Sequence, residues 1–206
     1  WNPNSSSSFI KKQGLPYNEG DVGPLYGFQL RHQGASYHDC ETDYSDQGFD
    51  QVKYVQDLLI NDPTSRRICF TCWSASDLDK MVLSPCHGSF VQFYVRKDKY
   101  LDCCAFQRSV DLALGLPYNI CSYAIMVRLL ALTCGYEPGD LIYNFGDCHI
   151  YENAYDAALL QSKRVPFSFP TLSLNERRNN IWEYTKEDLT LEGYTHHDAI
   201  KIKMVA

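Results

Sequence analysis

The chain has 206 residues, enough for one domain with a sizeable core, and its 45% hydrophobic content excludes a disordered protein. Its net charge of −6 argues against a general nucleic-acid binder, which carries a basic stripe. No apolar run approaches the roughly 20 residues needed to cross a bilayer, so no membrane association is expected. The nine cysteines lie mostly in apolar segments, which favours free thiols in a reducing, cytoplasmic compartment over a disulfide framework.

In chain order, residues 1–25 are rich in Gly, Pro and Ser and predict loops. Apolar spacing then predicts a helix, a strand, a hairpin of two strands, a second helix ending at Gly135, and a further strand and helix. Their ranges are Asp50–Ile60, Arg67–Trp73, Phe90–Val95 with Leu101–Phe106, 120–134, Leu141–Phe145 and 152–163, followed by short strands at 170–174, 188–192 and 200–204. The mixture predicts an α+β fold, and strands that are apolar on both faces predict a sheet covered on both sides.

The segment Leu83-Ser84-Pro85-Cys86-His87 is the first candidate for chemistry. Pro85 fixes the backbone before the cysteine, and a predicted strand follows almost at once. Cys86 is therefore expected at a strand entrance, where its thiolate could act as a nucleophile. The alternative is a buried structural cysteine beside a surface histidine.

Two groups of basic residues could hold a phosphate in this acidic chain. Gln107-Arg108-Ser109 combines a guanidinium fork with a hydroxyl, and the pair Arg66-Arg67 adds two positive charges. The alternative for each arginine is a structural ion pair.

Polar side chains further along suit a nucleoside. Asn119 both donates and accepts, as reading a pyrimidine edge requires, although it could instead cap the helix predicted after it. His149 and Tyr151 share one side of an extended segment and could bind a sugar hydroxyl, or simply end a strand. The CxxC pair Cys69 and Cys72 has side chains on opposite faces of a predicted strand and lacks companions, so no metal is expected.

Seven segments in order resemble thymidylate synthase over essentially the whole chain. They are Gly23–Gln29, Asp62–Arg67, Pro85–His87, Gln107–Ser109 with Asp111, Gly115–Asn119, Gly146–Tyr151 and Glu192–Tyr194. The stretch from Arg31 to Gln51 looks like the eukaryotic type, and the C-terminal tail also looks like protist forms. The resemblance implies a single domain over residues 1–206, lacking roughly its N-terminal third. It also implies a mixed twisted sheet covered by helices, with sheets packing across a homodimer.

The resemblance implies reductive methylation of dUMP to dTMP, with Cys86 adding to C6 of the uracil ring. The co-substrate 5,10-methylenetetrahydrofolate supplies both carbon and hydride, so no metal is required. Arg66 and Arg67 would reach across from the partner subunit, and Arg108 would both bind phosphate and favour the Cys86 thiolate. A fused dihydrofolate reductase domain upstream is a further possibility.

Three sets of site residues are implied by matching positions. The catalytic set is Cys86, Arg108, Asn119, Asp111, His87 and Tyr26. The dUMP set is Arg66, Arg67, Gln107, Arg108, Ser109, Asp111, Asn119, His149 and Tyr151. The folate set is Trp1, Asn4, Leu83, Asp111, Gly115, Tyr118 and Ala206.

Two alternatives stay open. One is dCMP hydroxymethylase, which shares the fold but tends to carry Asp where this chain has Asn119. The other is a non-catalytic, thymidylate-synthase-like assembly subunit. The absent part normally supplies a phosphate-loop arginine and a glutamate that organises proton transfers, so residues 1–206 alone are expected to be inactive. Gly88-Ser89 is an unusual pair after the Cys-His dipeptide.

Overall fold

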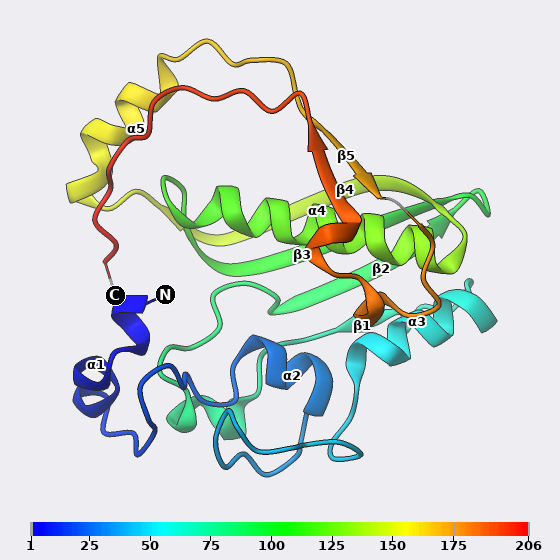
Figure 1. The fold of residues 1–206 in the computed structure, drawn as a ribbon, viewed down its shortest axis with the longest axis horizontal. Coiled ribbons are helices and arrows are strands. Elements are labelled where there is room, and N and C mark those ends of the chain that lie inside the picture. Colours follow the sequence, from blue (N-terminus) through cyan, green and yellow to red (C-terminus); the bar gives the residue numbers. More distant parts are fainter. Residues whose placement is uncertain (1, 175, 206) are drawn as a thin grey trace.

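The computed structural model describes residues 2–174 and 176–205 (Figure 1). Its elements in chain order comprise six strands, five α-helices and short 3₁₀ turns within those ranges. The helices are α1 (Ser7–Lys12), α2 (Tyr26–His32), α3 (Gln51–Asn61), α4 (Gly115–Cys134) and α5 (Tyr155–Ser162). The strands are β1 (Cys69–Phe70), β2 (Phe90–Arg96), β3 (Tyr100–Asp111), β4 (Glu137–His149), β5 (Thr171–Leu174) and β6 (Leu189–Glu192). The predicted α+β class is confirmed.

The main sheet has the order β1-β2-β3-β4 and is mixed. The hairpin pair β2 and β3 is antiparallel, whereas β4 lies parallel to β3 after the crossover helix α4. In this parallel register Ser109 is opposite Asp147 and Asp111 is opposite His149. Because parallel strands end at the same edge, these polar residues are brought to one edge of the sheet.

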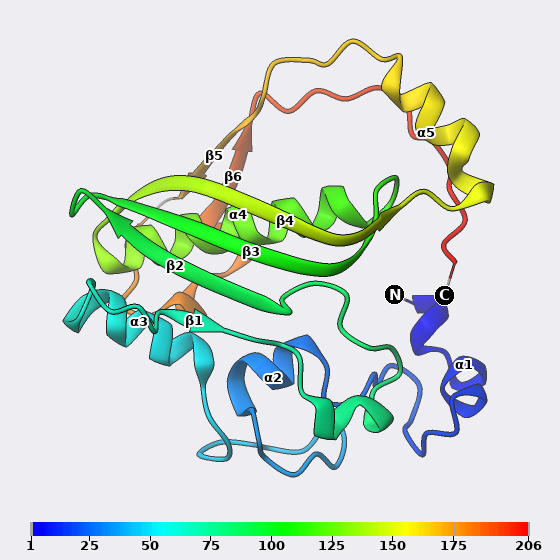
Figure 2. The same ribbon diagram turned by 180° about the vertical axis from the view of Figure 1, so that it is seen from behind.

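Helices α3 and α4 pack on one face of this sheet. Alternate β2 residues point into that core, and Val91 and Phe93 are buried there with Leu59 and Val127. Figure 2 shows the opposite face of β2, β3 and β4 with no helix across it. This open face carries the partly exposed side chains of Phe90, Tyr94, Phe106 and Ile142. Among the described residues, helices therefore cover one face of the sheet, whereas the sequence predicted a cover on both faces.

Helix α4 is longer than predicted, because it begins at Gly115 and not near 120. Its 20 residues make it long and apolar enough to cross a bilayer by length and composition, contrary to the expectation from sequence. Arg128 interrupts the apolar run, however, and Val127 and Leu130 are buried in the core beside the sheet. This packing indicates a core helix. Gly135 ends α4 in the left-handed conformation that the sequence predicts for a C-terminal cap.

Side chains explain where the sheet differs from prediction. The predicted strand Arg67–Trp73 pairs only at Cys69–Phe70. Gln51 replaces strand partners at Thr71, because its amide accepts from Thr71 N at 3.0 Å and donates to Thr71 O at 2.7 Å. The predicted strand at 200–204 is wrong, and Asn153 Nδ2 instead donates to Lys203 O at 2.9 Å.

The N-terminal region contains a short helix, although its composition predicts loops. Helix α1 begins after Ser6, whose hydroxyl accepts from Phe9 N, so the serine run supplies an N-cap. The other predicted elements are present with shifted ends.

Candidate active site

Cys86 lies in the loop before β2 and is fixed through its backbone. Its N–H donates to the Tyr26 hydroxyl at 3.0 Å, and its carbonyl accepts from Ser109 N at 3.3 Å. The Tyr26 hydroxyl is also 3.4 Å from the Cys86 sulfur, and the Cys86 side chain is only partly buried. Burial, and then the charge of a Cys86 thiolate, raise the pKa of Tyr26, so this hydroxyl stays protonated. The predicted alternative of a fully buried cysteine is wrong.

Arg108 lies against the cysteine loop. Its Nε donates to Pro85 O at 3.2 Å, and its guanidinium carbon is 5.3 Å from the ring centroid of Trp73. Arg108 as a residue remains exposed to solvent. A guanidinium held by one nitrogen keeps donors available for an anion. Trp73 was not among the predicted site residues.

His87 is held between two tyrosines. Its ring stacks on Tyr26 with centroids 4.1 Å apart, and its Nδ1 is 3.0 Å from the Tyr123 hydroxyl. Burial lowers the pKa of His87 from 6.5 to about 4, so the ring is neutral near pH 7. A Cβ at Gly88 would meet the Tyr123 hydroxyl oxygen at 2.9 Å, and the φ of +67° also favours glycine. The unusual Gly88 therefore permits the contact between His87 and Tyr123.

Gln107 is the centre of a buried amide network and is only 1% exposed. Its Nε2 donates to Ser109 O at 2.8 Å and to Asn119 Oδ1 at 3.0 Å. Its Oε1 accepts from the Tyr143 hydroxyl at 2.9 Å. Because α4 begins at Gly115, Asn119 lies within the first turns of the helix, and the alternative of an N-cap is wrong.

The remaining predicted residues near this edge are Asp111, Gly115, His149 and Tyr151. Asp111 Oδ1 accepts from Ala113 N at 3.0 Å in the turn before α4, and a Cβ on Gly115 would lie 3.8 Å from Asn119 Oδ1. The rings of His149 and Tyr151 meet edge to face at 4.8 Å, consistent with the predicted shared side. Their binding roles remain predictions.

Other predicted residues lie apart from Cys86. Arg66 and Arg67 precede β1, at the opposite edge of the sheet from β4, and line a separate hollow with Asp62. Tyr118 is exposed, and Leu83 is partly buried. Asn4 is buried, and its Oδ1 has no hydrogen-bond partner among the residues described. The predicted folate contacts Trp1 and Ala206 lie outside those residues.

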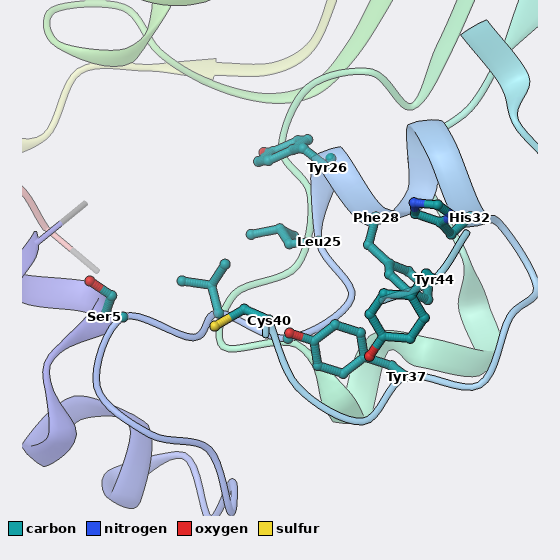
Figure 3. A pocket seen from close by; sticks show the side chains of 12 residues that line it. Ser5, Leu25, Tyr26, Phe28, His32, Tyr37, Cys40 and Tyr44 are labelled. Atoms are coloured by element: carbon teal, nitrogen blue, oxygen red, sulfur yellow. The ribbon is translucent and has the colours of Figure 1, made fainter. Parts of the chain in front are cut away.

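A cavity of about 590 Å³ lies beside this group and shares Tyr26 with it. Figure 3 shows Tyr26 and Leu25 near one another, with the rings of Phe28, Tyr37 and Tyr44 clustered apart from them. Within residues 2–174 and 176–205, no three His, Cys, Asp or Glu side chains gather as metal ligands would.

Sequence reasoning missed the contacts of Tyr123 and Tyr143 with the site. Tyr123 appears in the sequence as one apolar position of a helix. The available signal was its hydroxyl, since a buried tyrosine needs a hydrogen-bond partner.

The chain is similar to known proteins over its whole length. The chain matches the family described as "Thymidylate synthase" over residues 1–206. It is 44% identical to the "Bifunctional dihydrofolate reductase-thymidylate synthase" of Plasmodium chabaudi, covering 100% of this chain and 35% of that protein. It is 45% identical to the bifunctional protein of Paramecium tetraurelia, covering 99% of this chain and 44% of the relative. It is 43% identical to the "Thymidylate synthase" of Homo sapiens, covering 99% and 65%. The chain thus spans less than two thirds of the length of each.

Proposed function

This chain belongs to the thymidylate synthase family, and we propose that its protein converts dUMP to dTMP with 5,10-methylenetetrahydrofolate. The observation that carries the proposal is that residues 107–109 of β3 hold Cys86 and Asn119 beside Arg108. Ser109 N donates to Cys86 O, and Gln107 Nε2 donates to Asn119 Oδ1. Cys86, Arg108 and Asn119 supply a nucleophile, an anion-binding group and an amide able to read a base, from three separate segments of the chain.

In the proposed reaction, the Cys86 thiolate attacks C6 of uracil and a sulfur–carbon bond forms. The C5–C6 π electrons move toward C5 and O4, and C5 then attacks the methylene carbon of the folate as the bond from that carbon to N10 breaks. C5 loses its proton, the bond from the methylene carbon to N5 breaks to release the tetrahydrofolate, and hydride from that tetrahydrofolate reduces the exocyclic methylene to methyl. Release of the Cys86 thiolate gives dTMP and dihydrofolate.

The contacts of the site support this sequence of steps. The backbone of Cys86 is held by Tyr26 and by Ser109 N, so the sulfur has a defined position for attack. Arg108 and Ser109 lie next to that loop and supply donors for the phosphate. Asn119 Nδ2 can donate to the developing charge on O4.

The open face of the sheet supports the homodimer as part of the proposal. Its exposed Phe90, Tyr94, Phe106 and Ile142 side chains form the kind of apolar surface that a partner subunit covers. Arg66 and Arg67 lie away from Cys86 of their own chain, as residues serving the partner's site would. A fused dihydrofolate reductase domain is proposed by likeness to the bifunctional relatives, and sequencing upstream of this region tests it.

The test is release of tritium from C5-labelled dUMP by the intact protein. Cys86→Ser is expected to abolish release, because serine lacks the thiolate. Cys134→Ser is the matched control: Cys134 is also partly buried, but burial raises the pKa of its thiol to about 11, so it stays protonated. Substantial turnover by Cys86→Ser would refute the nucleophile. A covalent sulfur–C6 bond to 5-fluoro-dUMP, in the presence of the folate, would support it directly.

A further inference from the structure

The hydrogen bonds around Gln107 have only one self-consistent direction. Ser109 O is a backbone carbonyl and can only accept, so the Gln107 atom 2.8 Å from it must be the donor Nε2. The opposite end of the amide is then Oε1, which requires a donor. The Tyr143 hydroxyl supplies that donor at 2.9 Å.

The same amide fixes the orientation of Asn119. The second N–H of Gln107 Nε2 points at Asn119 at 3.0 Å, so the Asn119 atom facing it must be the acceptor Oδ1. Asn119 Nδ2 has no protein hydrogen-bond partner in the part of the chain that the structure describes, and both of its N–H groups remain available. Asn119 is therefore presented with one defined donor end and one acceptor oxygen.

That orientation distinguishes two pyrimidines. Uracil offers an acceptor at O4 and a donor at N3, which match the amide's Nδ2 and the second lone pair of Oδ1. Cytosine offers an amino donor at position 4 and an acceptor at N3. The donor Asn119 Nδ2 would then face the amino donor, and the acceptor Asn119 Oδ1 would face the acceptor N3, so neither hydrogen bond could form. A reversed Asn119 amide would favour cytosine instead.

We propose that Tyr143 is a positioning residue for base selection, acting through Gln107 to hold Asn119 in the orientation that accepts uracil and rejects cytosine. This role rests on the proposed function, because it assumes that Asn119 faces the base. Tyr143 is well placed to be rigid: its ring meets Tyr123 edge to face at 5.6 Å and lies 5.5 Å from Phe145.

Removing the Tyr143 hydroxyl leaves Gln107 Oε1 buried without a donor. The preference of the amide for its present orientation then rests on Ser109 O alone and is smaller, so Asn119 is held less firmly. In the intact protein, Tyr143→Phe should lower the preference for dUMP over dCMP by about tenfold, measured as the ratio of the two dissociation constants by calorimetry. Tyr143→His keeps a ring N–H donor and should restore part of that preference.

The matched control is Tyr136→Phe, because the Tyr136 hydroxyl also makes one partly buried hydrogen bond, 2.8 Å to Leu59 O, away from the site. It should lose stability without changing the dUMP to dCMP ratio. An unchanged ratio in Tyr143→Phe overturns the proposal, and so does an equal change in Tyr136→Phe. If Tyr143→Phe fails to fold, Tyr143→His is compared with Tyr143→Leu, which has no donor. A larger dUMP preference in the histidine variant supports the proposal, and equal preferences in the two variants overturn it.

Turnover is measured separately, so the two proposals fail in different ways. A wild-type protein that binds dUMP in preference to dCMP but releases no tritium overturns the proposed function. The ratio of the two dissociation constants can still be compared between wild type and Tyr143→Phe in that case. A wild type without preference overturns the positioning role itself.

Discussion

Protonation of His87 should make the folded protein unstable in mild acid. The ring lies between Tyr26 and Tyr123, and burial alone lowers its pKa from 6.5 to about 4. Above pH 6.5 the imidazole is neutral in both the folded and the unfolded chain, so the stability of the folded protein does not change through this group. As the pH falls below 6.5 the unfolded chain binds a proton that the folded chain refuses until about pH 4, so stability declines across that window.

The size of the effect follows from the difference between the two pKa values. Each pKa unit corresponds to about 1.4 kcal/mol, so the free energy of unfolding should fall by about 3 kcal/mol between pH 7 and pH 4 through this group. His87→Gln removes the titration while keeping a side chain that can hydrogen-bond to the Tyr123 hydroxyl. Urea unfolding of the two proteins over this pH range gives the difference directly.

The comparison isolates His87 because other acid-sensitive groups contribute equally to both proteins. His38→Gln, at an exposed histidine, serves as the control and should follow the wild-type curve. If the wild-type and His87→Gln curves stay parallel from pH 7 to pH 4, the folded protein accepts the proton readily and the reasoning from burial is wrong.

Three further predictions concern the dimer, the shared site and a helix cap. Ile142→Asp should weaken self-association at least about tenfold in analytical ultracentrifugation, because Ile142 is 51% exposed on the open face. Leu160→Asp, at a leucine 52% exposed on α5, is its control, and an unchanged mass for Ile142→Asp would count against the proposed interface. Mixing inactive Arg67→Ala and Cys86→Ala proteins should restore partial activity if subunits share sites; absence of rescue would argue for self-contained sites. Gly135→Ala should lower the free energy of unfolding by about 1 kcal/mol in urea, because Gly135 has a φ of +85°. Gly27→Ala is the control and should not lower it, because a Cβ there would meet nothing within 4 Å. Equal losses of unfolding free energy in the two variants would refute the role of Gly135 as a cap.

The elements best predicted from sequence are those whose pattern reports a local preference. The hairpin of β2 and β3 shows two runs of strand-forming residues joined by a charged turn, and α4 shows helical spacing up to Gly135. The predicted start of α4 was too late because Gly and Pro disfavour a helix interior, whereas Pro117 lies in the first helical turn, where its missing N–H costs little.

Long-range side-chain contacts determine much of the structure that could not be predicted from the sequence. Gln51 pairs with the backbone of Thr71 across 20 positions of sequence, and no local signal reports that substitution of a side chain for a strand. In the candidate site, too, some residues could be predicted from local sequence, whereas others depend on long-range packing. Cys86, Arg108 and Asn119 were predicted from residue chemistry and motif order, but the support from Tyr123 and Tyr143 depends on how α4 and β4 pack against each other.

Strand β3 serves two surfaces with alternate residues. Phe106 lies on the open face, and Gln107 is buried in the amide network. Arg108 is exposed to solvent beside the cysteine loop. A single inserted or deleted residue between Cys103 and Gln107 would exchange these assignments all at once. We therefore expect evolutionary changes of length to spare this strand and to accumulate in the turn at Lys97–Lys99, where an extra residue would leave both surfaces in register.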